Sequence, residues 1–403
     1  MKTMLNVVFL SPHFPNNLSL FCQRLNECGI GVLGLDHVQH HSLPRGLQTS
    51  LKDYYQVSDL HNFDELRQAL DYFMKTHGPI HYIESHNEYW LETQARLGAE
   101  FQIPGLKQES IEKIKRKSEM KKVFNSLGLK PARGELVSSL EHAKKVALTL
   151  GFPVILKPDI GVGAKGCVKI ESEAALETFF KEKRAEAYLM EEFVDGQIFS
   201  FDGLVDQTGE ILFCTSHVYG AGIAEVVQQK LDQVYYSLKT IPDDIEEAGR
   251  SILKAYELKG RFFHLEFFRK HQDHSLVPIE VNMRPPGGAT IDMCNFACDI
   301  DLYRLWAEML QRQDSMSFTY DRMYHCMSIS RRNTRSYLHS HEEVLKKCNH
   351  AIVHHDSVSP LFHATMGSHF YLVRAKKLET LYDLQHFILQ APAFHHPFSE
   401  VQS

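Results

Sequence analysis

Two short, apolar and aromatic-rich runs between residues 261 and 288 constrain the fold most. Arg261-Phe-Phe-His-Leu-Glu-Phe-Phe is followed, after the polar linker His271-Gln-Asp-His-Ser, by Val277-Pro-Ile-Glu-Val-Asn-Met-Arg-Pro-Pro-Gly-Gly. Both runs have the length and composition of strands, and the polar linker is typical of a hairpin connection. The sequence therefore predicts two neighbouring strands in this part of the chain.

Polar residues alternate with apolar ones in the second of these strands. Alternation places Glu280 and Asn282 on one face, Arg284 continues the row, and Glu266 can join from the neighbouring strand. Two carboxylates and an amide oxygen form a hard, oxygen-only site that suits Mg²⁺ carrying nucleotide phosphates. We therefore predict Glu266, Glu280 and Asn282 as metal ligands. The alternative is a buried salt-bridge cluster, which would leave excess negative charge at a high desolvation cost.

A glycine-rich loop follows another predicted strand, Pro153-Val-Ile-Leu-Lys-Pro, which ends at Lys157. Gly161, Gly163 and Gly166 would let backbone N–H groups approach a phosphate closely, with Lys157 as a point charge behind them. A tight hairpin would also use glycine, and no Gly-Lys-Ser/Thr sequence closes a P-loop here. The loop is thus a candidate phosphate site.

The segment Tyr188-Leu-Met-Glu-Glu-Phe-Val predicts a strand that runs into a turn. Phe193 and Val194 offer an apolar surface for a purine, whose edge backbone polar groups can read. Glu191 or Glu192 would accept a hydrogen bond from the adenine amino group or a ribose hydroxyl. The segment is therefore a candidate adenine site.

The N-terminal part of the chain follows a β-α-β pattern. Asn6–Leu10 predicts a buried strand, residues 18–28 a helix and Gly29–Asp36 a second strand, so we expect a parallel sheet. A GxGxxG sequence is absent, which argues against an ordinary dinucleotide site. His86, Asn87 and Glu88 follow a further predicted strand, where either ligand binding or helix capping explains them.

Helical patterns continue through the rest of the chain. We expect single helices over residues 111–127, which are rich in lysine, and over residues 290–310. Residues from about 325 onward predict an α+β portion, with helices over 342–348 and 378–389 and a strand over 368–374. The 403 residues are enough for two or three domains.

Composition excludes several function classes. A net charge of −6 makes nucleic acid or an anionic membrane an unexpected partner, and no apolar run approaches the ~18 residues of a membrane span. We expect a cytoplasmic protein that acts on small molecules. The eight cysteines lack zinc-site spacing, and the histidine pairs at 354–355 and 395–396 favour solvated or packing roles.

The order of these motifs resembles the ATP-grasp superfamily. A lysine-bearing helix, Lys157 with its glycine loop, Glu-Glu-Phe-Val, Glu266 and Glu-x-Asn-x-Arg follow one another between residues 106 and 310. Glu-Val-Asn-Met-Arg-Pro-Pro-Gly-Gly and the early Ser-Pro-His-Phe-Pro look most similar to the carboxylate-amine ligase branch. That branch includes L-amino acid ligases and proteins similar to the carbamoyl-phosphate synthase large chain.

The resemblance implies a fold of α/β and α+β parts. We expect a Rossmann-like pre-ATP-grasp domain over residues 1–105 and an ATP-grasp domain over residues 106–310, with two α+β subdomains that clamp ATP. Its lid subdomain would span about residues 152–195, and residues 311–403 would form the C-terminal α+β portion.

The resemblance also implies residue roles. Lys117, rather than Lys121 or Lys122, matches the first nucleotide lysine, and Lys157 matches the lysine at the α- and β-phosphates. Arg284 matches the arginine at the γ-phosphate, so Arg284 and Lys157 are the catalytic candidates. Gly287, Gly288 and His217 are candidates for substrate binding. Two residues depart from the pattern of relatives: Ile198 stands where many carry an acid for a ribose or second-shell contact, and Lys165 is bulkier than the residue often found in the glycine loop.

The expected reaction is ATP-dependent ligation of a carboxylate with an amine or a thiol. A carboxylate would attack the γ-phosphate of ATP with Mg²⁺ or Mn²⁺ bound, and the nucleophile would displace phosphate from the acyl phosphate. The alternatives are a bicarbonate-using carboxylase or carbamoyl-phosphate-type enzyme and a non-catalytic MgATP-binding module. The partners would be the two small-molecule substrates, and a homodimer is plausible for this class.

Overall fold

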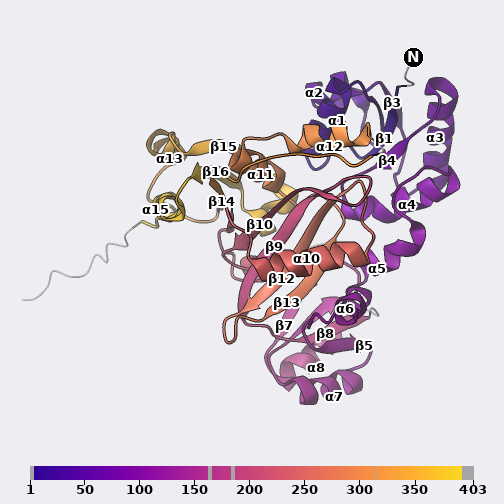
Figure 1. Cartoon of the computed structure of the whole chain (residues 1–403). Helices are drawn as coiled ribbons and strands as arrows, with labels where there is room; N and C mark the ends of the chain where they lie inside the picture. Colours follow the sequence, from indigo (N-terminus) through magenta and orange to yellow (C-terminus); the bar gives the residue numbers. More distant parts are fainter. Residues whose placement is uncertain (1–3, 162–165, 183–186, 313, 393–403) are drawn as a thin grey trace, which may run out of the picture. The chain divides into compact units, whose positions relative to one another are not determined.

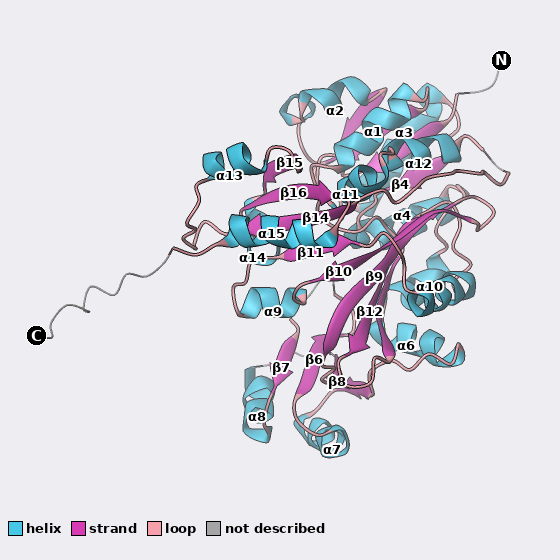
Figure 2. Ribbon diagram, turned by 60° about the vertical axis from the view of Figure 1, so that its left-hand side comes forward, coloured by secondary structure: helices cyan, strands magenta, loops and turns pink. Residues whose placement is uncertain are grey.

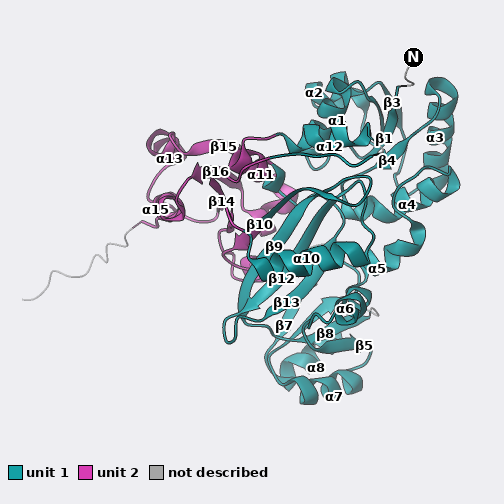
Figure 3. Cartoon of the chain, in the orientation of Figure 1, with its two compact units in different colours: residues 1–216, 241–291, 301–319 teal, residues 217–240, 292–300, 320–403 magenta. Residues whose placement is uncertain are grey.

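The computed structural model describes residues 4–161, 166–182, 187–312 and 314–392. These fold into two compact units (Figure 3). The first comprises residues 1–216, 241–291 and 301–319, and the second comprises residues 217–240, 292–300 and 320–403. The predicted division of the chain at residues 105 and 310 stays a prediction.

The first unit begins with a parallel sheet, as the sequence predicts. Its strand order is β3-β2-β1-β4, and β1 pairs in parallel with both β2 and β4 (Figure 1). The strands are β1 (Asn6–Leu10), β2 (Gly31–Asp36), β3 (Asp53–Gln56) and β4 (Tyr82–Glu84). The helices of this part are α1 (Leu18–Glu27), α2 (Arg45–Ser50), α3 (Phe63–His77) and α4 (Leu91–Glu100), with short 3₁₀ turns at His40–Ser42 and Glu88–Trp90. Apolar residues of the strands and of α3 form its core.

A small antiparallel sheet follows, with strand order β5-β8-β6-β7. Its strands are β5 (Gly134–Val137), β6 (Val154–Pro158), β7 (Val168–Ile170) and β8 (Tyr188–Glu192). Helices α7 (Leu140–Leu150) and α8 (Glu173–Glu182) contribute to the same apolar core as the strands. The predicted strands that end at Lys157 and at the Glu191–Glu192 pair are therefore neighbours.

A larger sheet in the first unit has the order β13-β12-β9-β10 (Figure 2). These strands are β9 (Gly196–Val205), β10 (Ile211–Tyr219), β12 (Phe262–Lys270) and β13 (Leu276–Asn282). β12 and β13 pair antiparallel, which confirms the predicted neighbouring strands. One face of the sheet is apolar and shares a core with α10 (Asp243–Ala255), in which Phe263, Leu265 and Phe267 are fully buried.

Both long helices expected from the sequence are interrupted. Residues 111–126 form α5 (Ile111–Lys115) and α6 (Lys117–Ser126), because Arg116 adopts an extended conformation and bridges to Ile160. A 3₁₀ turn at Gln108–Ser110 precedes α5. Residues 290–310 form α11 (Thr290–Cys298) and α12 (Leu302–Leu310). Here Asp299 has a positive φ and the Asp301 side chain caps α12, so the helical pattern of the sequence is broken locally.

The second unit contains the last residues of β10 and an antiparallel arrangement β11-β14-β16-β15. The strands are β11 (Val234–Ser237), β14 (His325–Arg331), β15 (Ile352–Ser357) and β16 (His369–Ala375). Its helices beside α11 are α9 (Ile223–Gln228), α13 (His341–Cys348), α14 (His363–Met366) and α15 (Leu378–Leu389), with a 3₁₀ turn at Pro360–Phe362. The predicted helices at 342–348 and 378–389 and the predicted strand at 368–374 are confirmed.

Two expectations from composition can be compared with the described residues. None of their helices is long and apolar enough to cross a membrane. None of the eight cysteines, which all lie within the described residues, forms a disulfide bond, and six of them are buried.

Candidate active site

The polar face of the β9–β12–β13 sheet brings the predicted metal ligands together. Glu266 on β12 lies directly opposite Glu280 on β13, and His264 lies opposite Asn282. On the other side of β12, Asp202 on β9 lies opposite His264. Because side chains alternate between the faces of a strand, these residues share one face, and the apolar residues between them enter the core.

Glu280 forms an ion pair with Lys117. Lys117 Nζ lies 2.7 Å from Glu280 Oε1 and donates a hydrogen bond of 3.2 Å to the carbonyl oxygen of Gly161. Burial raises the pKa of Glu280, and the carboxylates of Glu266 and Glu88 raise it further, although Lys117 opposes the shift. Lys117, the first residue of α6, therefore contacts both Gly161 and the sheet.

Glu266 is linked to a chain of buried polar groups that sequence reasoning missed. His264 Nε2 lies 3.3 Å from Glu266 Oε1, and His264 Nδ1 lies 2.5 Å from Asp202 Oδ1. Burial disfavours a charged ring, but Asp202 and Glu266 outweigh that effect and raise the pKa of His264 to about 10. The His264 imidazolium, together with Arg284, overcomes the effect of burial and lowers the pKa of Glu266.

Arg284 lies where the sheet meets the N-terminal parallel sheet. Its Nη2 is 3.0 Å from Glu88 Oε2 and 3.4 Å from Asn282 Oδ1, and its Nη1 donates to the Pro285 carbonyl at 2.9 Å. Glu88 is buried and follows the carboxyl end of β4. The neighbouring Asn87 accepts a hydrogen bond from the backbone N–H of Tyr89, so of the two residues only Glu88 faces the arginine.

Gly287 and Gly288 lie in the turn that follows Arg284. The carbonyl of Gly288 accepts a hydrogen bond of 3.2 Å from Asn17 Nδ2, in the loop after β1. The carbonyl of Gly287 accepts one of 2.6 Å from Thr290 Oγ1. The loops after β1 and β4 both reach this turn, at the carboxyl edge of a parallel sheet, where open α/β sheets bind ligands.

Glu191 and Glu192 point in opposite directions. Glu191 Oε2 lies 2.6 Å from Lys157 Nζ, and Lys121 contacts the same carboxylate. Burial would raise the pKa of Glu191, but the two lysines outweigh it and lower that pKa. Glu192 instead receives a hydrogen bond of 2.7 Å from Arg133 Nε. Of the two candidate acids, Glu191 therefore faces the lysines.

The other residues predicted to bind the nucleotide differ in exposure. Phe193 is 40% exposed, and Lys169 Nζ lies 4.5 Å from the centroid of its ring, whereas Val194 is buried. Gly166 is exposed and has a φ of 80°. Gly163 and Lys165 lie outside the described residues. The ring of Phe193 thus makes a cation–π contact and is partly accessible to solvent.

His217 belongs to the second unit, where it is buried on β10 opposite Ser237. Its ring centroid lies 6.1 Å from that of Tyr235. Its proposed contact with a substrate stays a prediction.

The sequence interpretation missed the contributions of Lys121, Asp202 and His264 to the site. It also missed the pairing of Glu88 with Arg284. Strand alternation could have identified two of these residues. His264 stands two residues before Glu266, and Asp202 follows Ser200 by the same spacing, so each pair lies on one face of its strand. Lys121 stands four residues after Lys117 and so lies on the same helix face.

Comparisons with known proteins agree with the resemblance to the ATP-grasp superfamily that the order of motifs indicates. Residues 150–292 match the family model of the ATP-grasp domain. The L-arginine-specific L-amino acid ligase of Bacillus subtilis is 26% identical over 265 residues, which cover 62% of each protein. The arginine-specific large chain of carbamoyl phosphate synthase from Bacillus subtilis (strain 168) is 27% identical over 132 residues, which cover 32% of this chain and 12% of that one.

Among solved structures, the L-amino acid ligase from Bacillus licheniformis superposes with a TM-score of 0.74. The match covers 96% of this chain and 97% of that one at 16% sequence identity, which is evidence for a shared fold. The chain spans less than two thirds of the length of the curated relatives named above. The resemblance seen in the order of motifs is confirmed: the chain contains an ATP-grasp domain and has the fold of ATP-grasp proteins.

Proposed function

We propose that the protein is an ATP-dependent ligase that joins a carboxylate to an amine through an acyl phosphate and releases ADP and phosphate. The observation that carries the proposal is the cross-strand pair Glu266 and Glu280, with Asn282 and Arg284 continuing the row, inside an ATP-grasp domain. A thiol in place of the amine would need the same activated carboxylate.

The donor set fits Mg²⁺. Two carboxylates lie directly opposite each other on adjacent strands, and burial together with the negative charge of Glu266 raises the pKa of Glu280. The side-chain oxygen of Asn282 supplies a third hard donor. Bound Mg²⁺, or Mn²⁺ on the same oxygens, would neutralise charge on the ATP phosphates.

Two lysines are placed to hold the nucleotide. Lys117 and Lys157 are buried or nearly so, and each is now neutralised by one carboxylate, Glu280 or Glu191. Phosphate oxygens in the same space would accept hydrogen bonds from both ammonium groups. The loop that begins at Gly161 would add backbone N–H groups, and Glu191 through Val194 would contact the adenosine.

Arg284 would act on the transferred phosphoryl group. A substrate carboxylate oxygen forms a bond to the γ-phosphorus while the bond to the ADP oxygen breaks, and negative charge spreads over the phosphoryl oxygens. The guanidinium stabilises that charge in a site where Glu88 and Asn282 fix its position. The amine then attacks the acyl carbon and phosphate leaves, with Gly287 and Gly288 lining the approach.

The experiment that tests the reaction is a phosphate-release screen in which a panel of carboxylic acids, including amino acids, is crossed with a panel of amines and thiols. ADP and phosphate formed in equal amounts only when both substrates are present would support the ligase. Release that depends strictly on bicarbonate would instead indicate a carboxylase or a carbamoyl-phosphate-type enzyme. Tight MgATP binding without ADP formation on any pair would contradict the proposal and indicate a binding module.

The metal assignment is tested by the double variant Glu280→Gln/Asn282→Ala. We expect ATP turnover to fall by a hundredfold or more, because removing a single group that stabilises charge in a transition state costs on the order of 10²–10³ in rate. The matched control is Glu257→Gln, which removes one exposed carboxylate outside the site. Unchanged turnover and Mg²⁺ dependence in the double variant would show that these residues hold no catalytic metal.

A cytoplasmic location and a homodimer stay predictions. Sedimentation of the purified chain with and without MgATP would measure its oligomeric state directly.

A further inference from the structure

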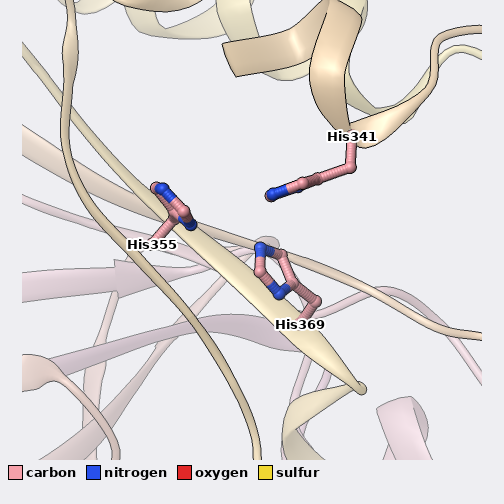
Figure 4. Close-up of side chains that lie close together, drawn as sticks. All are labelled: His341, His355 and His369. Atoms are coloured by element: carbon pink, nitrogen blue, oxygen red, sulfur yellow. The ribbon is translucent and has the colours of Figure 1, made fainter.

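Three histidines of the second unit lie together in a part of the chain that the ligase proposal does not use. They are His341 at the start of α13, His355 on β15 and His369 on β16. One ring nitrogen of each lies within 4.8 Å of the corresponding atoms of the other two. Figure 4 shows the ring of His341 reaching from its helix toward the rings on the two strands.

The strand register explains why two of these side chains share a face. His355 lies opposite Tyr371, and His369 lies opposite Ser357, so His355 and His369 are diagonal neighbours on antiparallel strands. His354, one residue earlier, points away, with its ring centroid 5.6 Å from that of Phe370. The adjacent pair in the sequence is thus divided between the two faces of β15.

The surroundings of His341 and His369 leave ring nitrogens available. Nδ1 of His341 lies 2.7 Å from the hydroxyl of Tyr371, so an Nδ1–H that donates to this oxygen leaves the Nε2 lone pair free to bind a metal. Nε2 of His369 is buried and has no hydrogen-bond partner among the described residues. A buried imidazole nitrogen without a partner is costly unless a ligand satisfies it.

An anion is the competing ligand for this region. His341, His369 and Tyr371 line a surface pocket together with Arg331 and Arg332. However, Arg331 donates to the carbonyls of Ile388 and His339, and Arg332 donates to those of Leu231, His363 and Ala364. These guanidinium groups are already held by backbone oxygens, which favours a ligand that binds the imidazoles.

We propose that His341, His355 and His369 bind a divalent first-row transition metal ion, with Zn²⁺ as the expected ion and a fourth position open to water. Imidazole nitrogen suits Zn²⁺, Cu²⁺ and Ni²⁺ and disfavours Mg²⁺. Zinc–nitrogen bonds of ~2.1 Å in a tetrahedron place the ligand atoms ~3.4 Å apart, so small side-chain rotations close the site. The metal would tie the start of α13 to β15 and β16.

The test is Zn²⁺ titration of the full-length protein after chelation, with calorimetry for affinity and Co²⁺ absorption for coordination geometry. We expect one tight site per chain and a tetrahedral Co²⁺ spectrum, with no heat from Mg²⁺ at this site. His355→Ala and His369→Ala should each weaken Zn²⁺ binding by at least about tenfold and abolish the Co²⁺ spectrum.

Two control variants separate this site from other histidines. His354→Ala removes the neighbouring exposed imidazole on the opposite face and should bind Zn²⁺ like the unchanged protein. His395→Ala/His396→Ala removes the histidine pair of the C-terminal segment and should do the same. Loss of tight binding in the latter variant alone would place the metal elsewhere and overturn the proposal.

If His369→Ala fails to fold, the His355→Ala variant still tests the proposal, because His355 is exposed. Zn²⁺ should raise the thermal unfolding midpoint of the unchanged protein and of His354→Ala, and leave that of His355→Ala unchanged. Equal Zn²⁺ affinity in His355→Ala and the unchanged protein would overturn the proposal.

Discussion

At the scale of single residues, the candidate site consists of paired charges that a nucleotide would rearrange. Lys117 and Glu280 neutralise each other, as do Lys157 and Glu191, and Lys121 shares the second carboxylate. Such pairs keep buried charges satisfied in the absence of a ligand. Each lysine therefore has its own carboxylate partner.

Replacing Lys157 with Met is expected to weaken ATP binding by about tenfold to a hundredfold, the loss of one charge-assisted hydrogen bond. Lys117→Met should have an effect of similar size, since its ammonium group also faces the loop at Gly161. Lys113→Met, an exposed lysine on α5, is the matched control. Titration with a fluorescent ATP analogue measures the affinity of all three variants. Equal affinity in Lys113→Met and Lys157→Met would contradict the assignment of Lys157 to the nucleotide site.

At the scale of elements, the break between α5 and α6 positions Lys117. Arg116 leaves the helix and bridges to Ile160, so Lys117 becomes the first residue of α6. Arg116 makes no side-chain hydrogen bond that caps the N-terminus of α6. Asp159, which follows β6, caps it instead, because its Oδ1 accepts a hydrogen bond of 2.8 Å from the backbone N–H of Ser118. Its backbone carbonyl accepts another of 3.0 Å from the Lys117 N–H.

Asp159→Ala is therefore expected to lower the free energy of unfolding by about 1–2 kcal/mol, as loss of a helix cap does. It also removes one of the two carboxylate partners of Arg116, whose Nη1 lies 3.2 Å from Asp159 Oδ2 and whose Nε contacts Glu112. Urea unfolding measures the change, and Asp195→Ala, at an exposed acid, is the control. We also expect weaker ATP binding, because the start of α6 carries Lys117. A variant as stable as the control would show that Asp159 caps nothing.

At the scale of the whole molecule, burial of one histidine predicts how stability changes with pH. His86 is buried among aromatic side chains, and its ring centroid lies 4.4 Å from that of Trp306. Burial lowers the pKa of His86 to about 4, from an ordinary value of 6.5. As the pH falls, the unfolded chain therefore binds a proton at His86 before the folded chain does. The stability that the neutral ring contributes is present above pH 6.5 and is lost as the pH falls toward 4.

Between pH 7.5 and 5 this effect is expected to remove about 2 kcal/mol from the free energy of unfolding. His86→Asn keeps a residue that tolerates the positive φ at this position. The variant should be less stable at pH 7.5, because ring packing is lost, yet should lose less stability on acidification. Urea unfolding followed by tryptophan fluorescence measures both values, and equal pH dependence in the two proteins would contradict the prediction.

Much of the candidate site was accessible from local sequence patterns. Alternation in one strand places Glu280 and Asn282 on the same face, and the strand register brings Glu266 opposite Glu280. Lys157 and the glycine loop are predicted from a local pattern as well, a strand followed by glycines, and their role stays a prediction. The helix over residues 111–127 was misjudged, because the bridge from Arg116 to Ile160 joins residues far apart in the chain.

The sequence by itself determined the parallel N-terminal sheet and the β12–β13 hairpin with its acids, because these depend on periodicity over a few residues. Only the tertiary structure decided which charges pair: Lys121 with Glu191, His264 with Asp202 and Arg284 with Glu88. It also brought His341 to His355 and His369. Such partners come from separate strands, helices and loops, so their distances are set by packing and strand register rather than by spacing along the chain.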